Sequence, residues 1–351
     1  MGAAGAARRG HLTGGLAQVC VVLSALLGGI SGSAVADAAM QSRFLGPHML
    51  RGGYSKGFTC AILSFSSLIV ATLPPSLGLI IFGSVANVSV GRLFVGGIVP
   101  GILMTIFMMF TTYLISRKRG YKVATMIKPT AGELLYTGGR SFWALLFPVI
   151  LIVFIRMGLF TTSEAGAFAI VYALFIGKVF HKELQLRHIP RVLDAAITDI
   201  GAILLIITTA GMFGYMATYV NLPASMGAYL VSLTDNAHML LFLSLLLLLV
   251  IGTVLESSVL CLIFVPILLP SLVQYGIDPV HFGLLGMTIM TMGVSTPPVG
   301  TAMFVTCGIL KGSVDEYVRE SWPYLLTVLV LVFILAAFPS LVLFLPNLIF
   351  G

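Results

Sequence analysis

Apolar runs recur from one end of the chain to the other, and polar residues stand mainly between them. A helix needs about 20 apolar residues to cross a bilayer. The first two runs, 16–28 and 33–45, are shorter, at about 13 residues or roughly 20 Å each as helix. We therefore expect them to form a re-entrant hairpin that enters and leaves on the cytoplasmic side, with its tip at "GGISGS", residues 28–33.

Longer runs after this hairpin predict membrane spans. The first covers 58–86 and is broken at Pro74-Pro75, and the next returns to Arg117. Two further spans are expected in "SFWALLFPVILIVFIRMGLF" and "EAGAFAIVYALFIGKVF", and an amphipathic arm helix at the interface in "KELQLRHIPRVLDAAITDI". The last predicted elements are a span over 201–219, a second hairpin over 240–270, a second broken span over 282–309 and a final helix. This pattern indicates an all-α polytopic membrane protein.

Prolines reveal an internal repeat at an offset of 223 residues. The prolines within residues 1–128 are Pro47, Pro74, Pro75 and Pro100, and their partners at this offset are Pro270, Pro297, Pro298 and Pro323. Because residues 224–351 contain eight prolines, chance predicts about a quarter of one match. Gly29 with Gly252 and Gly53 with Gly276 follow the same offset. We divide the chain into a first repeat (1–128), a connector with scaffold helices (129–223) and a second repeat (224–351).

Positive residues orient the two repeats in opposite directions. Arg43, Arg51 and Lys56 precede the first Pro-Pro, whereas the equivalent "FVPILLPSLVQYGIDPVHFG" contains no Lys or Arg. Since cytoplasmic loops carry the excess of Lys and Arg, the repeats are expected to be inverted, which is typical of transporters. The spans that begin at residue 141 precede the second hairpin. The offset of 223 exceeds 141 by 82, so the partners of these spans in the other repeat would begin about 82 residues before residue 1, where we expect them.

Composition agrees with a membrane protein. The 351 residues are 58% hydrophobic and 9% charged, and the mean hydropathy is +1.08, whereas soluble domains are about 25% charged. The net charge of +7 comes from residues between apolar runs, so it marks cytoplasmic loops and not a nucleic-acid partner. The cysteines are expected to be core residues without a disulfide or a metal, because none is in CxxC spacing: Cys20, Cys60, Cys261 and Cys307.

The stretch "GGISGSAVAD" has two competing interpretations. Arg8 and Arg9, an apolar run and "AVA" imitate a signal peptide, but a cleaved signal would not recur inside the chain as Gly29 does. "GISG" resembles the nucleophile turn of rhomboid-type intramembrane proteases, which needs a general base on a neighbouring span. The histidines lie in loops or at helix ends and are interpreted as interfacial: His11, His48, His181, His188, His238 and His281. No catalytic residue is therefore predicted.

The chemistry is expected at four helix breaks, namely the tips "GGISGS" and "IGTVLESS" and the unwound "TLPPS" and "STPPVG". Free carbonyls and amides survive in a membrane only where protein, water or ions complete them. Backbone carbonyls and side-chain oxygens would suit Na⁺, and helix N-termini would attract a carboxylate. The candidate Na⁺-binding side chains are Ser31, Ser33, Thr72, Ser76, Glu256, Ser257, Ser258, Ser295 and Thr296. Asp37 has two interpretations: it is a coupling acid, or it caps its helix or pairs with Arg43. The side chain of Arg156 is expected to extend to the outer membrane interface.

Several motifs resemble one known family. "GGLAQVCVVLSALLGGISGSAVADAA", "PPSLGLIIFGSVANVSVGRLFVGGIVPG", "TSEAGAFAIVYAL", "GIDPVHFGLL" and "STPPVGTAMFV" are similar to the large membrane (M) subunit of TRAP, or tripartite ATP-independent periplasmic, transporters. The resemblance implies a Na⁺-coupled importer of organic acids, such as dicarboxylates or sugar acids, in a bacterial or archaeal inner membrane. Its implied partners are a periplasmic binding protein and a small membrane (Q) subunit, and its implied mechanism is of the elevator type.

The resemblance also extends the list of site residues. It adds the glycines of the tips and breaks to the Na⁺ site: Gly29, Gly32, Gly252 and Gly300. The substrate is expected next to the helix N-termini, at Ser33, Pro75, Ser258 and Pro298. No cofactor is implied beyond the coupling ion. The family's amino-terminal helices are expected before residue 1, and "MQSRFLGPHML" is unusually polar. A binding-protein-independent Na⁺/dicarboxylate symporter and a non-transporting scaffold left by truncation therefore remain alternatives.

Overall fold

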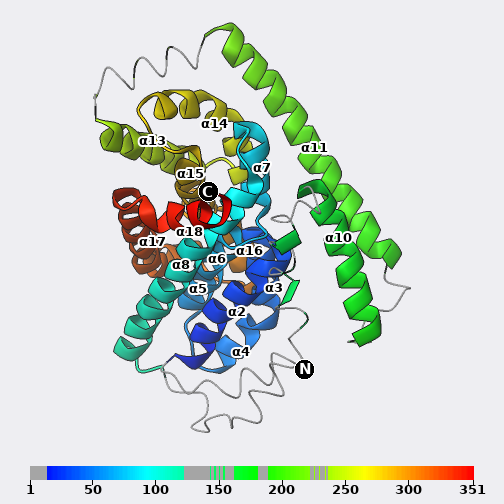
Figure 1. The fold of residues 1–351 in the computed structure, drawn as a ribbon. Coiled ribbons are helices and arrows are strands. Elements are labelled where there is room, and N and C mark those ends of the chain that lie inside the picture. Colours follow the sequence, from blue (N-terminus) through cyan, green and yellow to red (C-terminus); the bar gives the residue numbers. More distant parts are fainter. Residues whose placement is uncertain are drawn as a thin grey trace.

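The computed structural model describes residues 14–121, 162–180, 189–221 and 236–351, with single positions between 143 and 234. These residues form helices and no strand, which confirms the all-α prediction (Figure 1). The first repeat contains α2 (Gly15–Ser31), α3 (Ala34–Phe44), α4 (Gly46–Arg51), α5 (Lys56–Ser66), α6 (Leu68–Thr72), α7 (Leu77–Ala86) and α8 (Val90–Lys118). The connector contributes α10 (Thr162–Phe175), the π-helix η1 (Ile176–Phe180) and α11 (Ile189–Tyr219). The second repeat contains α13 (Ala237–Gly252), α14 (Ser257–Gln274), α15 (Pro279–Val294), α16 (Thr301–Leu310), α17 (Val314–Ala337) and α18 (Ser340–Phe350).

Several of these helices are suited to a bilayer. Within the described ranges, α8, α14 and α17 are each long and apolar enough to cross a membrane. The run from α5 through α6 and α7 would make a fourth span, bent by 46° at its break. The described part of the chain is therefore compatible with a multi-pass membrane protein.

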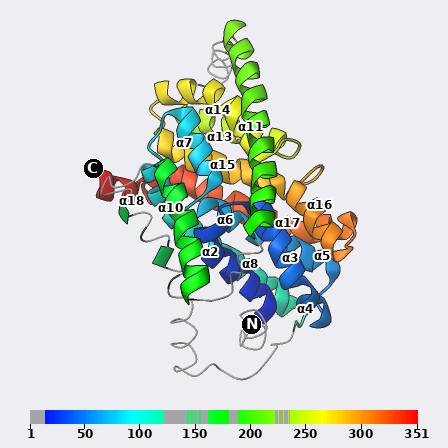
Figure 2. The same cartoon turned by 90° about the vertical axis from the view of Figure 1, so that its right-hand side faces the viewer.

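Helix bounds in the second repeat follow those in the first at an offset close to 223. At this offset α13 corresponds to α2, and α14 corresponds to α3 together with α4. Each of these segments is followed by a glycine with positive φ, Gly53 at 84° and Gly276 at 81°. Contacts between the repeats are reciprocal: α7 packs on α14 and α16 on α3, while α5 packs on α17 and α15 on α8. The two hairpins lie at opposite ends of the molecule in both views (Figures 1 and 2).

Aromatic residues fill the contact between α5 and α17. Phe65 stacks on Tyr324 with ring centroids 6.0 Å apart and on Tyr317 at 6.5 Å. All three rings are fully buried, and each buried aromatic side chain removes a large apolar area from the surroundings. This pair of helices therefore joins the first repeat firmly to the second.

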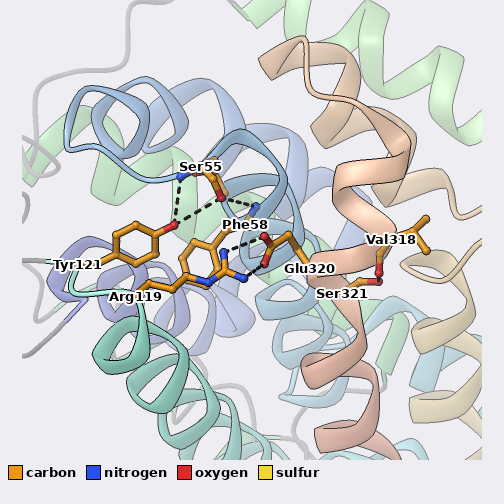
Figure 3. A network of polar contacts seen from close by, with 8 residues as sticks. Ser55, Phe58, Arg119, Tyr121, Val318, Glu320 and Ser321 are labelled. Carbon is orange, nitrogen blue, oxygen red and sulfur yellow. Dashed lines mark hydrogen bonds and ion pairs between the residues drawn. The ribbon is translucent and has the colours of Figure 1, made fainter.

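A polar network lies where α5 and α17 begin and α8 ends (Figure 3). The Arg119 guanidinium donates to Glu320 Oε1 at 2.8 Å and stacks over the Phe58 ring, 5.7 Å from its centroid. Glu320 raises the pKa of Arg119 through this hydrogen bond. The Tyr121 hydroxyl accepts from the Ser55 amide at 3.3 Å. Three helix ends are therefore tied together at one end of the bundle.

Some boundaries differ from the predictions. The helix α2 has 17 residues, not about 13, because it continues through the glycines of the tip until the left-handed Gly32 ends it. From Ile189 onward, the predicted arm and the following span form one helix, α11, since nothing at 200–201 breaks the backbone. The earlier part of the predicted arm lies outside the described residues. The final helix is divided at Phe338 and Pro339 into α17 and α18. Most of the span predicted at 141–160, with Arg156, lies outside the described residues.

The interfacial position predicted for the histidines is wrong for His281. It lies in the first turn of α15, as the sequence suggests, but its side chain is buried. Its Nε2 lies 2.9 Å from the Leu335 carbonyl oxygen of α17. A hydrogen bond between helices, and not the membrane surface, therefore explains its position.

Candidate functional site

Tip one and break one meet through their backbones. Gly32 ends α2 in the left-handed region, with φ 60°, and its carbonyl oxygen accepts from the Leu77 amide at 3.3 Å. A methyl group on Gly32 would lie 2.7 Å from the Pro75 carbonyl oxygen. Neither proline of the cis Pro74-Pro75 pair has an amide to continue α6. The predicted residues Gly29 and Ser31 lie in the last turn of α2.

Tip two and break two meet in the same way. The Thr253 carbonyl, just after α13, accepts from the Val299 amide at 3.1 Å. Gly293 of α15 lies so close to the Gly252 carbonyl that a methyl group would overlap it. Pro297-Pro298 is also cis, and Gly300 precedes α16. In each repeat, the amide after a Pro-Pro break thus donates to a carbonyl at the hairpin tip.

Three predicted ligand hydroxyls donate to backbone carbonyls of the helix that precedes the break. Thr72 Oγ1 donates to Leu68 O at 3.1 Å, Ser76 Oγ to Ala71 O at 2.6 Å and Thr296 Oγ1 to Met292 O at 2.8 Å. All three side chains are buried. A hydroxyl that has given its proton to a carbonyl keeps its lone pairs for other partners. These oxygens are therefore arranged as acceptors, which is what a cation needs.

Ser295 lies in a network that the sequence analysis missed. Ser295 Oγ donates to Ser64 O at 3.2 Å and accepts from Ser64 Oγ at 3.0 Å. The Tyr317 hydroxyl donates to the Ser295 carbonyl at 2.7 Å. All three residues are buried, so α5 and α17 hold the end of α15 in place. Polar residues inside apolar helices were the available signal.

Glu256 and its neighbours cap α14. The Glu256 carboxylate accepts from the Ser258 amide at 2.7 Å and the Ser257 hydroxyl at 2.8 Å. The Ser258 hydroxyl also points to it, at 3.3 Å. A negative side chain at a helix N-terminus is stabilising. The equivalent cap of α3 is Ser33, whose Oγ accepts from the Ala36 amide at 3.4 Å.

Burial separates the two predicted sets of residues. The hydroxyl-bearing residues of the breaks, Thr72, Ser76, Ser295 and Thr296, are buried. The positions predicted to meet the substrate are more accessible: Ser33, Pro75 and Ser258 are half-buried and Pro298 is exposed. The predicted ion ligands of the breaks thus lie deeper than the predicted substrate positions.

Asp37 is a buried residue of α3, one turn from the tip. Its Oδ2 accepts from Ser24 Oγ at 2.8 Å and from Gln41 Nε2 at 2.7 Å. Arg43, the alternative partner, is exposed and makes no ion pair with Asp37 among the described residues. Ser24 and Gln41 were missed in the sequence, although Gln41 lies four residues from Asp37 on the same helix face.

The four breaks come together through contacts between the repeats. Val35 and Ala38 of α3 pack with Val294 and Ala302 of α15 and α16, which brings tip one to break two. On the other side, α7 packs on α14. Helix N-termini and C-termini are therefore linked at the tips and breaks, where they offer partial positive and negative charge to ligands.

Apolar helices with two hairpins and two proline-broken helices define a membrane permease. The profile of the family "Tripartite ATP-independent periplasmic transporter, DctM component" matches residues 4–341. The chain belongs to this family of TRAP transporter large permeases, which confirms the resemblance seen in its motifs.

Named relatives support this assignment. The chain is 36% identical to the sialic acid TRAP transporter large permease SiaM of Vibrio cholerae, over 97% of this chain and 80% of the relative. It is 34% identical to the C4-dicarboxylate TRAP transporter large permease DctM of Rhodobacter capsulatus, with the same coverage. It is 32% identical to the isethionate TRAP transporter permease DctMQ of Oleidesulfovibrio alaskensis, over 98% of this chain and 55% of the relative.

Proposed function

We propose that this TRAP large permease imports an organic acid by coupling its uptake to Na⁺ entry across a bacterial or archaeal inner membrane. A periplasmic binding protein delivers the substrate, and a small membrane (Q) subunit completes the complex. The names of the relatives include sialic acid, C4-dicarboxylate and isethionate, all of which carry an acidic group. The relative named DctMQ combines the letters M and Q in a single chain, which supports the pairing of the two membrane subunits.

The pairing of each tip with its break is the observation that carries the Na⁺ proposal. Gly32 with Leu77 and Thr253 with Val299 hold carbonyl-rich helix ends together. Beside them, buried hydroxyls such as Thr72 and Thr296 present lone pairs. Two such oxygen-rich places would each bind a small hard cation, with Gly29, Gly252 and Gly300 allowing the backbone to approach it closely.

The proposed substrate site lies between these ion sites and the surface. Ser33 is the N-cap of α3, and Ser258 lies in the first turn of α14. Helix N-termini attract anions. Pro75 and Pro298 flank them at the breaks. Bound Na⁺ would add positive charge beside a carboxylate, so ion and substrate stabilise each other. Gradient coupling requires this reciprocity.

The proposed transport motion is an elevator movement of two inverted repeats. The reciprocal packing of α7 on α14 and α16 on α3 supports a transport unit that moves as one body. The hairpins at opposite ends of the molecule (Figure 2) and the unequal distribution of positive residues support the inversion. Alternating access in such folds is largely rigid-body movement around a fixed site.

The first prediction compares two threonines on one helix. Thr296 and Thr291 are both buried, and each donates to the carbonyl four residues earlier, at 2.8 and 2.7 Å. Only Thr296 lies at the break. In proteoliposomes with the complete complex and its binding protein, Thr296→Ala should raise the Na⁺ concentration for half-maximal uptake by about tenfold, as expected for the loss of one ligand worth about 1.4 kcal/mol.

The control variant Thr291→Ala should leave this Na⁺ concentration within about twofold of wild type, because only its helix-internal hydrogen bond is lost. Ser31→Ala should behave like Thr296→Ala. Unchanged Na⁺ dependence in both Ser31→Ala and Thr296→Ala would contradict the ion assignment. Uptake without the binding protein would favour a self-sufficient symporter, and no uptake under any condition would favour a scaffold.

A further inference from the structure

A polar cavity lies where α5 and α17 begin, at the end of the molecule whose Lys and Arg residues predict a cytoplasmic position. Its volume is about 370 Å³. Ser55 and Glu320 border it beside the Arg119 network (Figure 3). We call it the α5–α17 cavity, and its other lining residues are Lys56, Gly57, Glu316 and Arg319.

The α5–α17 cavity contains separated charges of both signs. Glu320 is already paired with Arg119, at 2.8 Å. Lys56 Nζ donates to a backbone carbonyl oxygen at 3.4 Å. Lys56, Glu316 and Arg319 form no ion pair within the described parts of the chain. Two positive groups and one carboxylate are therefore free to bind a ligand.

An exposed row of apolar residues on α17 begins next to this cavity. Trp322, Leu326 and Val330 are spaced four residues apart and lie on the helix face that carries Arg319. These three apolar side chains are 57%, 55% and 50% exposed. We call them the apolar stripe. A charged cavity and an uncovered apolar surface thus adjoin on one side of α17.

The length of the apolar stripe corresponds to one leaflet of a bilayer. From Arg319 to Val330 the helix rises about 16 Å, and the hydrocarbon of one leaflet is about 15 Å thick. Tryptophan is enriched at membrane interfaces, with its ring at the level of the headgroups. Trp322, one turn from Arg319, therefore puts the cavity at headgroup depth and the rest of the stripe beside acyl chains.

A phospholipid whose headgroup has a primary ammonium matches both parts. Its phosphate would accept charge-assisted hydrogen bonds from Lys56 and Arg319. Its ammonium, two carbons from the phosphate, would pair with Glu316. A headgroup with a phosphate alone would leave Glu316 without a cation and beside a second negative charge. The two signs of charge in the cavity thus favour a zwitterionic headgroup.

The equivalent surface of the first repeat lacks these residues. At an offset of 223, the positions of Lys56, Arg319 and Trp322 are occupied by Pro279, Gly96 and Val99. At this level α18 packs against α8, which is the counterpart of α17. The repeated fold therefore does not require the charges or the tryptophan, and they occur where the helix face is uncovered.

We propose that the α5–α17 cavity and the apolar stripe bind one phospholipid of the phosphatidylethanolamine class from the cytoplasmic leaflet. Lys56 and Arg319 hold its phosphate, Glu316 holds its ammonium and the apolar stripe contacts its acyl chains. The lipid connects the beginnings of α5 and α17. This inference goes beyond the proposed function, because the lipid binds whether or not Na⁺ and the organic acid are bound.

Native mass spectrometry of the purified protein tests the headgroup. Phosphatidylethanolamine and phosphatidylcholine with identical acyl chains would be titrated, and the bound fractions compared. Wild type should bind phosphatidylethanolamine about tenfold more tightly, because the methylated nitrogen of phosphatidylcholine cannot donate a hydrogen bond to Glu316. Glu316→Gln should lose this preference, and Arg319→Gln should weaken the binding of both lipids. Asp315→Asn is the matched control, because Asp315 is the exposed neighbour in the same turn and does not line the cavity.

Fluorescence quenching locates the acyl chains. The chain has two tryptophans, Trp143 and Trp322, so Trp143→Phe leaves Trp322 as the reporter. Phosphatidylethanolamine with brominated acyl chains should quench its emission more than brominated phosphatidylcholine does at the same mole fraction. Adding Glu316→Gln should make the two lipids equal. The unquenched emission spectrum also shows whether each variant is folded.

Equal affinity of the wild type for the two lipids would overturn the proposal, as would a preference that survives in Glu316→Gln. Tighter binding of phosphatidylglycerol would assign the cavity to an anionic lipid, and full competition by inorganic phosphate would assign it to a soluble anion. A tightly bound polypeptide that shields Trp322 from every brominated lipid would assign the stripe to a partner subunit. None of these results changes the Na⁺ dependence of uptake, so a failure of the lipid site is separate from a failure of the proposed function.

Discussion

Single side chains decide how firmly each Pro-Pro break is held. At break two, Ser295 is bonded to Ser64 of α5, and its carbonyl accepts from Tyr317 of α17. The equivalent residue at break one, Thr72, donates only to Leu68 in its own helix. Side-chain hydrogen bonds from two neighbouring helices therefore anchor break two, whereas the Thr72 hydroxyl at break one is bonded within α6. The two ion sites should differ in how easily they rearrange.

Tyr317→Phe tests this anchor. The change keeps the ring that stacks on Phe65 but leaves the buried Ser295 carbonyl without its donor, at a cost of about 1–3 kcal/mol. We expect a lower unfolding temperature in detergent and a higher Na⁺ concentration for half-maximal stabilisation. Both quantities can be read from thermal unfolding curves measured at several Na⁺ concentrations.

Tyr324→Phe is a matched control for this measurement. Tyr324 is also fully buried and stacks on Phe65, but its hydroxyl pairs with Thr112 Oγ1 at 3.2 Å, away from both breaks. It should lower stability without changing the Na⁺ concentration for half-maximal stabilisation. Equal Na⁺ effects in both variants would indicate that Tyr317 does not position break two.

At the scale of elements, the sequence predicted helices better than it predicted their ends and partners. Prolines 74, 75, 297 and 298 located both breaks, because a residue without an amide cannot continue a helix. The division of the final helix at Phe338 was not predicted. A proline alone is an ambiguous signal for a helix end, because Pro100, Pro323 and Pro346 lie inside continuous helices. Whether a proline ends a helix depends on tertiary packing. The contacts of Ser295 with Ser64 and Tyr317 are also tertiary, and no local pattern records them.

The packing of α13 against α15 gives a prediction at this scale. Gly293 of α15 leaves no room for a methyl group beside the Gly252 carbonyl, whereas Gly308 of α16 has no atom within 4 Å of such a group. Both glycines lie inside helices, where alanine is favoured by about 0.5–1 kcal/mol. Gly293→Ala should therefore lower the unfolding temperature and weaken Na⁺ binding at tip two, while Gly308→Ala should be neutral or stabilising.

Thermal unfolding of the purified protein with and without Na⁺ measures both effects. The contact at Gly293 is between backbone atoms of two helices, so rotation of a side chain cannot relieve it. The idea that tip two needs this close approach would be abandoned if Gly293→Ala and Gly308→Ala were equally stable and equally stabilised by Na⁺.

At the scale of the whole molecule, charge is concentrated at the end that contains the Arg119 network. Arg119 with Glu320, and Lys56 with the Lys311 carbonyl at 3.4 Å, lie where α8 ends and α5 and α17 begin. Cytoplasmic ends of membrane proteins carry more Lys and Arg. This end is therefore proposed to face the cytoplasm. Hairpin two, at the opposite end of the molecule (Figure 1), would then open to the outside.

Two equivalent residues provide the test of this orientation. Arg51 is the last residue of α4 and Gln274 the last of α14, they are 223 positions apart, and both are exposed. The four native cysteines are buried, so a cysteine introduced at either position should dominate labelling by a membrane-impermeant maleimide. In spheroplasts, Gln274→Cys should be labelled at once, and Arg51→Cys only after the membrane is permeabilised.

Inverted repeats require opposite sides for these positions, whereas parallel repeats place both on one side. Labelling of both from the same side would therefore remove the inversion on which the elevator proposal depends, although the family assignment would stand.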